Sequence, residues 1–298
     1  MHPLNIIKAG VYIFRKANLS RFGKQTSEVF DYPILHKCPA QKLCNNQGVK
    51  KSMKFSQHAA LTSALFASLP IVQAAETDAE TGPVDVSANV ALTTDFVDRG
   101  LTYTDGDPAI QGGFDVDHET GAYVKTWAAN VKLLEDDTVK PEDRATVLIG
   151  LYAGYEGDII SDKLSYELQA AHYLFPGASS DLNYDTTEFM ANLTYSIQKT
   201  DLGLSYFFSP DMFGTGNSHY GVFSVTHTFV NELEISGQVG WQGFEDNKAM
   251  GLDDYLYHGL SLSYPIGDFT VAINYSNTDL DNADDVGGDD RVYFTLSY

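Results

Sequence analysis

The sequence predicts an all-β protein: an antiparallel, up-and-down transmembrane β-barrel of about 12 strands. Three observations predict this fold. Apolar and polar residues alternate with period two in successive segments from Val84 onward. Most of these segments have about ten residues, the length that a tilted strand needs to cross a bilayer. The connections between them are alternately long and short, as in bacterial outer-membrane barrels that keep both termini on the inner side.

The chain begins with residues that we expect to lie outside the barrel. Residues 50–76, KKSMKFSQHAALTSALFASLPIVQAAE, join three lysines to an apolar stretch and then to small residues, the pattern of a secretory signal peptide. A transmembrane helix needs ~20 apolar residues, and this stretch is too short and too interrupted to be one. The alternative to a signal peptide is therefore a buried helix. We predict a signal peptide at 53–74, translated from Met53. Residues 1–52 are then a non-native or disordered extension, or alternatively a real cytoplasmic one.

Charge divides the chain in the same place. Residues 1–74 contain 10 of the 19 lysines and arginines and both cysteines, whereas residues 75–298 contain 38 of the 40 acidic side chains. Such acidity repels nucleic-acid phosphates, so nucleic acid is excluded as a partner. A barrel also needs no disulfide framework, because ladder hydrogen bonds stabilise it. Residues 75–298 are therefore predicted to form one barrel.

The strand segments follow in order along this part of the chain. In most of them an apolar face alternates with a polar one, while 109–117 alternates weakly and 218–230 is ambiguous. In 122–134 the apolar set is Tyr123, Trp127, Ala129 and Val131, with Lys125 as the odd member. The predicted segments are 84–96, 109–117, 122–134, 144–157, 163–175, 186–199, 201–208, 218–230, 232–244, 255–266, 268–276 and 291–298.

The connections and the chain end support a membrane location. We expect long external loops at 96–108, 135–143, 176–184, 210–218, 245–254 and 277–290, and short turns at 118–121, 157–162, 199–201, 230–232 and 265–268. The last strand, RVYFTLSY, ends in Tyr298, as in strands that act as assembly signals for the barrel-assembly machinery of Gram-negative bacteria. A secreted soluble β-sandwich or barrel is the alternative.

Residues 93–131 contain a recognisable motif: an aromatic residue and Arg-Gly, then Pro-Ala and Gln-Gly pairs, then Gly-x-Tyr and a tryptophan. These residues are Phe96, Arg99, Gly100, Pro108, Ala109, Gln111, Gly112, Gly121, Tyr123 and Trp127. The motif resembles that of the TorF-type porins, a proteobacterial family described as conserved hypothetical. A second glycine that is common in that family is replaced here by Val124 and Lys125. The resemblance implies an outer-membrane β-barrel with porin activity and no assigned substrate.

Arg99 is the leading candidate for a pore residue. It is one of nine basic residues after residue 75, and Asp95, Asp98, Asp105 and Asp107 lie near it in the sequence. If the first long loop folds inward, Arg99 could face these acids across a constriction and determine ion selectivity. The interpretation that we prefer is a structural salt bridge that holds the loop. Gly100, Gly112 and Gly113 are expected to allow a bulge or a close backbone approach.

Other chemistry has weak support in the sequence. The acidic runs at 133–143 and 279–290 could attract divalent cations, but the second lacks EF-hand spacing, so a solvated loop is favoured. Four histidines, at positions 172, 219, 227 and 258, are scattered over three segments. No hydrolase or phosphate-binding motif occurs, so we assign no catalytic, cofactor or metal residue.

These observations predict a barrel that conducts ions or small solutes through a narrow or partly blocked lumen, with a lean toward cations. Outer-membrane lipid and the transported solutes are the expected partners. A structural or adhesive barrel and a membrane-embedded hydrolase are the alternatives.

Overall fold

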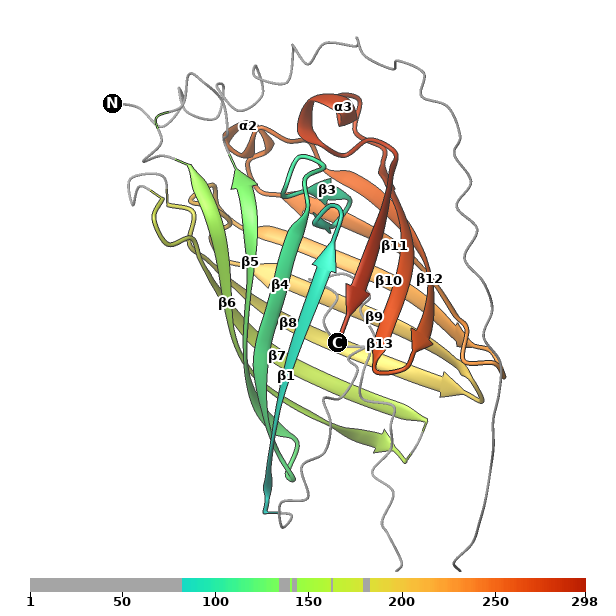
Figure 1. Ribbon diagram of the computed structural model, residues 1–298. Coiled ribbons are helices and arrows are strands. Elements are labelled where there is room, and N and C mark those ends of the chain that lie inside the picture. The colour runs from blue at the N-terminus through green and yellow to red at the C-terminus, as the bar shows by residue number, and fades with distance from the viewer. Residues whose placement is uncertain (1–81, 134–139, 141–143, 162, 179–182) are drawn as a thin grey trace, which may run out of the picture.

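Twelve antiparallel strands close into a barrel in the computed structural model, which describes residues 82–133, 140, 144–161, 163–178 and 183–298 (Figure 1). The predicted fold class and strand number are therefore confirmed. The extension and the signal peptide lie outside the described residues. The barrel strands are β1 (Val84–Thr93), β4 (Ala109–His118), β5 (Ala122–Leu133), β6 (Ala145–Ile160), β7 (Leu164–Leu174), β8 (Thr186–Ile197), β9 (Thr200–Ser209), β10 (Ser218–Thr228), β11 (Glu234–Phe244), β12 (Tyr255–Ile266), β13 (Phe269–Thr278) and β14 (Arg291–Ser297).

The outer surface of the barrel is apolar on every strand. Large hydrophobic side chains are exposed there, while serine, threonine, asparagine, glutamine and glutamate side chains are buried toward the interior. A soluble barrel would have the opposite arrangement, because its apolar face must pack away from water. One exposed residue from each of the twelve strands illustrates the pattern: Val86, Phe114, Val124, Leu151, Leu168, Phe189, Leu204, Phe223, Val239, Leu260, Ile273 and Phe294.

Strand β5 departs from the predicted orientation. We expected its apolar set to form the outer face, but Tyr123, Ala129 and Val131 are buried and Val124 is exposed. The ring of Trp127 lies 5.6 Å from that of the buried Phe96. The apolar face of β5 therefore points inward because a segment inside the barrel packs against it.

Small residues inside the wall provide space for tyrosine rings. Gly150 and Gly154 lie on the inner face of β6. A Cβ atom at Gly150 would meet the ring of Tyr152, and one at Gly154 would meet the ring of Tyr123. The sheet therefore accommodates aromatic side chains that lie flat against it, and the lumen is narrower than the small residues suggest.

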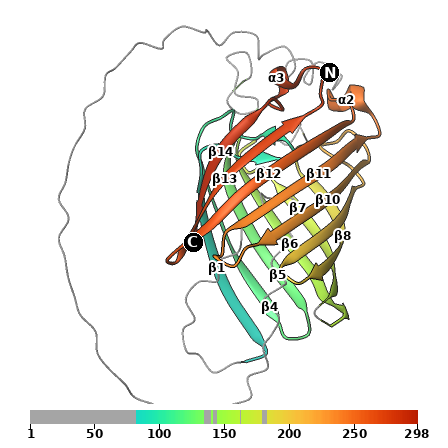
Figure 2. The same ribbon diagram turned by 90° about the vertical axis from the view of Figure 1, so that its right-hand side faces the viewer.

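The connections are arranged as predicted. Figure 2 shows α2 (Asn247–Met250) and α3 (Ala283–Val286) in loops at one end of the barrel, while short turns join the strands at the other end. Among the described residues, no helix combines the length and hydropathy needed to cross a membrane.

The C-terminal residue takes part in barrel closure. Strand β1 pairs with β14 only over Ala91–Thr93 in the strand register. Beyond it, the backbone N–H of Tyr298 donates to the carbonyl of Val90 (2.9 Å), and Val90 N–H donates back (3.0 Å). The ring of Tyr298 packs on Phe269, with 5.3 Å between centroids. Tyr298 therefore lengthens the short pairing of β1 with β14 that closes the barrel.

Candidate functional site

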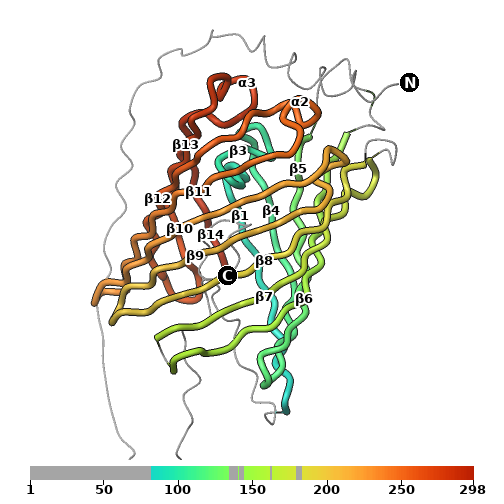
Figure 3. The backbone as a smooth tube through the Cα atoms, turned by 180° about the vertical axis from the view of Figure 1, so that it is seen from behind, coloured from blue at the N-terminus to red at the C-terminus, as the bar shows by residue number. Residues whose placement is uncertain are grey.

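A short hairpin between β1 and β4 lies inside the barrel. It consists of β2 (Val97–Asp98) and β3 (Leu101–Thr102), which pair through Val97 with Thr102 and Asp98 with Leu101. Figure 3 shows this cyan segment within the ring of strands, near the end that carries α2 and α3. The first long loop therefore folds inward, as one of the two interpretations of Arg99 required.

The turn of the hairpin has an unusual backbone. Arg99 and Gly100 both have positive φ, at 48° and 84°. Positive φ at both central residues is typical of the two-residue type I′ turn, which suits the twist of paired strands. Glycine accepts this conformation readily, whereas arginine rarely adopts it. The backbone therefore holds Arg99 at the tip of the hairpin at some conformational cost.

Aromatic packing holds the base of the hairpin. The ring of Phe96 lies 5.2 Å from that of Tyr103 and 5.6 Å from that of Trp127. The hydroxyl of Thr104 accepts a hydrogen bond from Phe96 N–H (2.9 Å), and the carbonyl of Tyr103 accepts one from Lys132 N–H (2.7 Å). Phe96 and Trp127, both in the TorF-type motif, therefore fix the hairpin to β5.

A second clamp attaches the hairpin to the last external loop. Nη1 of Arg291 donates to Asp95 at 3.0 Å, and the hydroxyl of Thr104 donates to the same carboxylate at 3.0 Å. The carbonyl of Gly287 accepts from Thr102 N–H at 3.0 Å. Asp95 thus pairs with Arg291 and not with Arg99.

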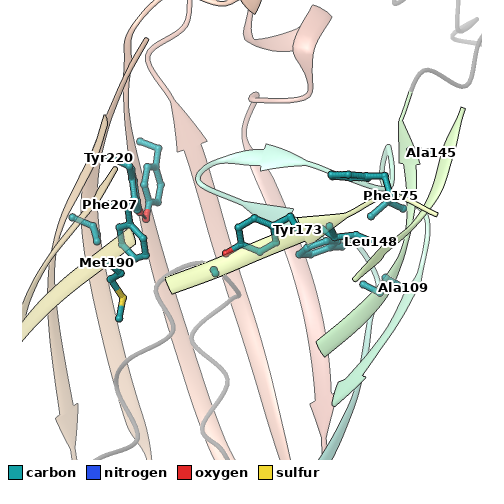
Figure 4. Packing of buried hydrophobic residues seen from close by; sticks show 14 of the residues in the cluster. Ala109, Ala145, Leu148, Tyr173, Phe175, Met190, Phe207 and Tyr220 are labelled. Carbon is teal, nitrogen blue, oxygen red and sulfur yellow. Dashed lines mark hydrogen bonds between the residues drawn. The ribbon is translucent and has the colours of Figure 1, made fainter. Parts of the chain in front are cut away.

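Arg99 crosses the interior to the opposite wall. Its Nη2 donates to both carboxylate oxygens of Glu188 on β8, at 2.9 and 2.8 Å, and its Nη1 donates to Oε1 of Gln242 on β11 at 3.0 Å. The guanidinium carbon lies 4.3 Å from the ring centroid of Tyr220 on β10 and 5.3 Å from that of Phe207 on β9. Figure 4 shows Tyr220 and Phe207 on one wall, with Tyr173, Leu148 and Phe175 on the other side. Arg99 thus tethers the inward hairpin to four strands.

Most of the acids near Arg99 in the sequence are not its partners in the structure. Of the four acids that the pore interpretation placed opposite Arg99, only Asp98 approaches it, with 3.9 Å between the side-chain atoms. Asp107 pairs with Lys132 at an exposed site. Asp105 has a positive φ of 53° in the same loop. The reason is geometric: the hairpin turns Arg99 away from the acids of its own loop and toward the far wall.

Further motif residues lie at the start of β4, which follows the hairpin loop. Asn130 of β5, which is outside the motif, holds this start by accepting from Ile110 N–H (2.8 Å) and donating to the carbonyl of Pro108 (3.2 Å). Ala109 and Gln111 are buried. Gly112 pairs with Val90 in regular register, and a Cβ there would lie 2.7 Å from the carbonyl oxygen of Asn89. This glycine therefore allows a close backbone approach, and the expected bulge does not occur there.

The two remaining motif residues lie toward the end with the short turns. Gly121, with φ at 92°, occupies the turn between β4 and β5. The hydroxyl of Tyr123 donates to the buried Glu167 and accepts from Nε2 of Gln169 at 2.8 Å. Tyr123 is therefore part of a polar network inside the barrel.

Carboxylates dominate the interior between the hairpin and the short turns. Asp115 and Glu167 are buried on the inner face, and the ammonium of Lys125 lies 4.4 Å from the centroid of the Tyr123 ring. Asp95, Asp98 and Glu188 are further buried acids, and Arg99, Lys125 and Arg291 are cations on the inner side. Acids therefore outnumber cations among these inward-facing side chains.

A cavity of about 70 Å³ lies beside the hairpin. Asp98, Arg99, Thr186, Glu188 and Gln242 are polar residues in its lining, and Tyr173 and Tyr255 contribute aromatic surface. Its remaining walls include residues of the long loops, among them Phe213 and Leu252. The space next to Arg99 is therefore lined on one side by the loops of the α2 and α3 end.

Burial changes the acidity of the hairpin tip. It raises the pKa of Asp98 from its ordinary 3.8 to about 7, against the opposing charge of Arg99 and with a contribution from Glu188. Burial by itself would lower the pKa of Arg99, but the charge of Glu188 keeps it above its ordinary value. Arg99 therefore stays charged, while Asp98 titrates near neutrality.

Three of the four histidines make a hydrogen bond to a neighbouring strand. Ring nitrogens of His172, His219 and His227 hydrogen-bond to Thr187 (2.9 Å), Tyr206 (2.6 Å) and Thr200 (2.8 Å). His258 stands next to the buried Tyr257 and, like the other three, alternates with inward-facing neighbours. No group of three or more potential metal ligands occurs in the part of the chain that the structure describes, which excludes most of the acidic run 133–143.

Sequence reasoning missed the residues that receive Arg99. Glu188 and Gln242 alternate with apolar neighbours and so could be placed on the polar face of their strands. Tyr220 lies in the segment whose faces were ambiguous, and Phe207 could not be told from an outward aromatic. These residues meet Arg99 only because the barrel closes. Glu188 is 89 residues and Gln242 is 143 residues from Arg99 in the sequence, and no local sequence pattern indicates such a contact.

Comparisons with known proteins identify a family. The model of a family described as "Bacterial protein of unknown function (Gcw_chp)" matches residues 76–296. No curated protein matches the sequence.

Solved structures of similar shape include bacterial porins. The KdgM porin, in complex with disordered oligogalacturonate, has 9% identity and a TM-score of 0.47, covering 72% of this chain and 98% of its own. The NanC porin has 12% identity and a TM-score of 0.48, with 71% and 98% covered. Salmonella typhi OmpF, in complex with daunomycin, has 9% identity and a TM-score of 0.40, with 72% and 97% covered.

Proposed function

The chain belongs to the family described as "Bacterial protein of unknown function (Gcw_chp)", and from this premise we propose that it is an outer-membrane channel for ions and small solutes. The observation that carries the proposal is the closed barrel whose apolar side chains face outward on all twelve strands while polar side chains face inward. Hydrocarbon cannot satisfy backbone hydrogen bonds, so a membrane sheet must close on itself, and its lumen is then a path for water.

The inward hairpin restricts this path. Arg99, Glu188 and Gln242 join opposite walls through hydrogen bonds, so the proposed channel is narrow at this level and excludes bulk solutes. The interior carboxylates support a preference for cations over anions. The motif residues that build the hairpin also support assignment to the TorF-type porins, and the alternating C-terminal strand supports recognition of the barrel by the assembly machinery. We infer that the protein is not an enzyme.

Conductance measurements test the channel. Purified, refolded protein in planar bilayers is expected to produce discrete current steps, and its reversal potential in a potassium chloride gradient should lie toward the potassium equilibrium potential. Detergent without protein serves as the blank. Bilayers that stay silent while the barrel is demonstrably folded would favour the structural or adhesive alternative.

We expect the conductance to depend on pH through Asp98. The docked hairpin holds this carboxyl with a pKa of about 7, whereas the ordinary value is 3.8. Because docking raises the pKa of Asp98, docking is strongest when the pH is below 3.8. It weakens as the pH rises through about 7, where the docked carboxyl loses its proton. The open probability should therefore increase from about pH 5 to about pH 8.

The matched variants are Asp98→Asn and Asp107→Asn. The first removes the titrating group and should flatten the pH profile. The second removes an exposed acid of the same loop, paired with Lys132, and should leave the profile unchanged. An Asp98→Asn channel with the wild-type pH profile would contradict this origin of the dependence.

A further inference from the structure

The groups that receive Arg99 form a site that belongs to the barrel wall and not to the hairpin. We call it the guanidinium socket: Glu188 of β8, Phe207 of β9, Tyr220 of β10 and Gln242 of β11. All four side chains belong to residues that are at most 2% exposed. Together they present a carboxylate, an amide oxygen and two aromatic rings to one cation.

Contacts within the wall hold the socket in place. Nε2 of Gln242 donates to the hydroxyl of Ser218 at 2.7 Å, which directs Oε1 toward the guanidinium. The hydroxyl of Tyr220 is hydrogen-bonded to that of Tyr257 on β12, and the two rings stack with an interplanar angle of 22°. The ring of Phe207 packs against Tyr220 at 5.2 Å. Because none of these contacts involves the hairpin, Phe207, Tyr220 and Gln242 should keep their positions when Arg99 leaves.

The chemistry of the socket matches a planar cation. A carboxylate that accepts hydrogen bonds through both oxygens, with aromatic rings beside it, suits the flat, delocalised guanidinium better than a compact ammonium ion. Aromatic faces add cation–π attraction when water is excluded. The adjoining cavity shares Glu188 and Gln242 with the socket and is lined elsewhere by residues of the long loops. A solute from the α2 and α3 end would therefore meet the socket beside the hairpin.

Arg99 reaches this site from a strained position. Its φ of 48° lies in the left-handed region, which is unfavourable for a residue with a side chain. A cation on a short tether with an unfavourable backbone can be displaced more easily than one on an unstrained segment. The hairpin thus resembles a tethered ligand in a site that the wall provides.

We propose that the guanidinium socket binds guanidinium-bearing solutes that enter the channel, and that Arg99 is a built-in competitor that occupies the socket in their absence. This inference rests on the proposed channel function and names the solute class that the channel recognises. A solute that takes the place of Arg99 against Glu188 and Gln242 frees the hairpin tip, so recognition and opening are coupled at one site.

The test uses the Arg99→Gly variant, since glycine accepts the positive φ of this position. Guanidinium chloride and ammonium chloride, at equal millimolar concentrations, are added to the variant in bilayers and, separately, to the detergent-solubilised barrel in a calorimeter. Guanidinium should bind the variant at least about tenfold more tightly than ammonium, a difference of ~1.4 kcal/mol. It should also reduce the variant's current in a saturable manner.

Two controls isolate the socket. Adding Glu188→Gln to Arg99→Gly should abolish the preference for guanidinium. Lys132→Ala, which removes another cation near the first loop, should bind no more guanidinium than the wild type, because Arg99 still fills the socket. If Arg99→Gly does not fold, Arg99→Gln keeps a long neutral side chain and tests the same binding.

The outcomes distinguish the two proposals. A conducting Arg99→Gly channel with equal affinity for guanidinium and ammonium would overturn the socket and leave the channel standing. A variant that binds guanidinium selectively but never conducts would support the socket and overturn the channel. Selective binding that survives Glu188→Gln would also overturn the socket as defined.

Discussion

Gly100→Val is expected to raise the single-channel conductance several-fold while the barrel remains folded. The backbone at Gly100 has φ at 84°, and a Cβ there would lie 2.5 Å from Cγ2 of Thr278 and 2.8 Å from Cβ of Tyr257. Both neighbours belong to barrel strands and cannot move far. The left-handed backbone adds about 1–2 kcal/mol for a residue with a Cβ. The hairpin should therefore leave the lumen, whereas the strand ladder, which does not include it, should persist.

Gly106→Ala is the matched control for Gly100→Val. Gly106 lies in the same loop with a similar φ of 77°, but the nearest atom to its Cβ would be Nη1 of Arg291 at 3.9 Å. This variant introduces backbone strain without the clash and should conduct almost as the wild type does. If Gly100→Val folds, as judged by heat-modifiable gel mobility, and its conductance is unchanged, the hairpin does not restrict the channel.

Leu204→Arg is expected to destabilise the barrel by about 2–4 kcal/mol when it is folded into phospholipid vesicles, the cost of an arginine on the lipid face near the bilayer midplane. Leu204 lies midway along β9 and is 58% exposed on the outer face. In water an exposed leucine could be replaced by arginine at almost no cost. The measurement is the free energy of unfolding from reversible urea titrations.

Val230→Arg provides the comparison for Leu204→Arg. Val230 is 92% exposed in the connection between β10 and β11, at the end of the barrel with the short turns. Near the interface or in water the same change should cost about 0–1 kcal/mol. Equal costs at the two positions would indicate a soluble barrel and would remove the basis of the proposed channel.

The periodicity of the sequence predicted most of the fold because strand orientation is a local property. In β9 and β12 the side chains alternate between faces residue by residue, and one face must meet the surroundings while the other meets the interior. Loop lengths fix which ends of the strands lie together. Strand β5 was misread because its aromatic residues face the interior and not lipid. Trp127 packs against Phe96 inside the barrel, and the hydroxyl of Tyr123 joins a buried polar network with Glu167 and Gln169.

The candidate site was predicted only in part. The rarity of basic residues drew attention to Arg99, and the motif marked Phe96 and Gly100 as special. The partners of Arg99 were assigned to its own loop, since sequence proximity was the only guide available. The positive φ at Arg99 turns its side chain across the lumen, and the nearest buried carboxylate there is that of Glu188.

The sequence by itself determined the strand pattern, the number of strands, the polarity of most faces and the identity of the loop that carries the arginine, because each follows from a repeat or a composition over a few residues. Only the tertiary structure decided where Arg99 binds. Barrel closure brings Glu188, Phe207, Tyr220 and Gln242 together from four strands, and the fit between a guanidinium and those groups exists only when the strands are side by side.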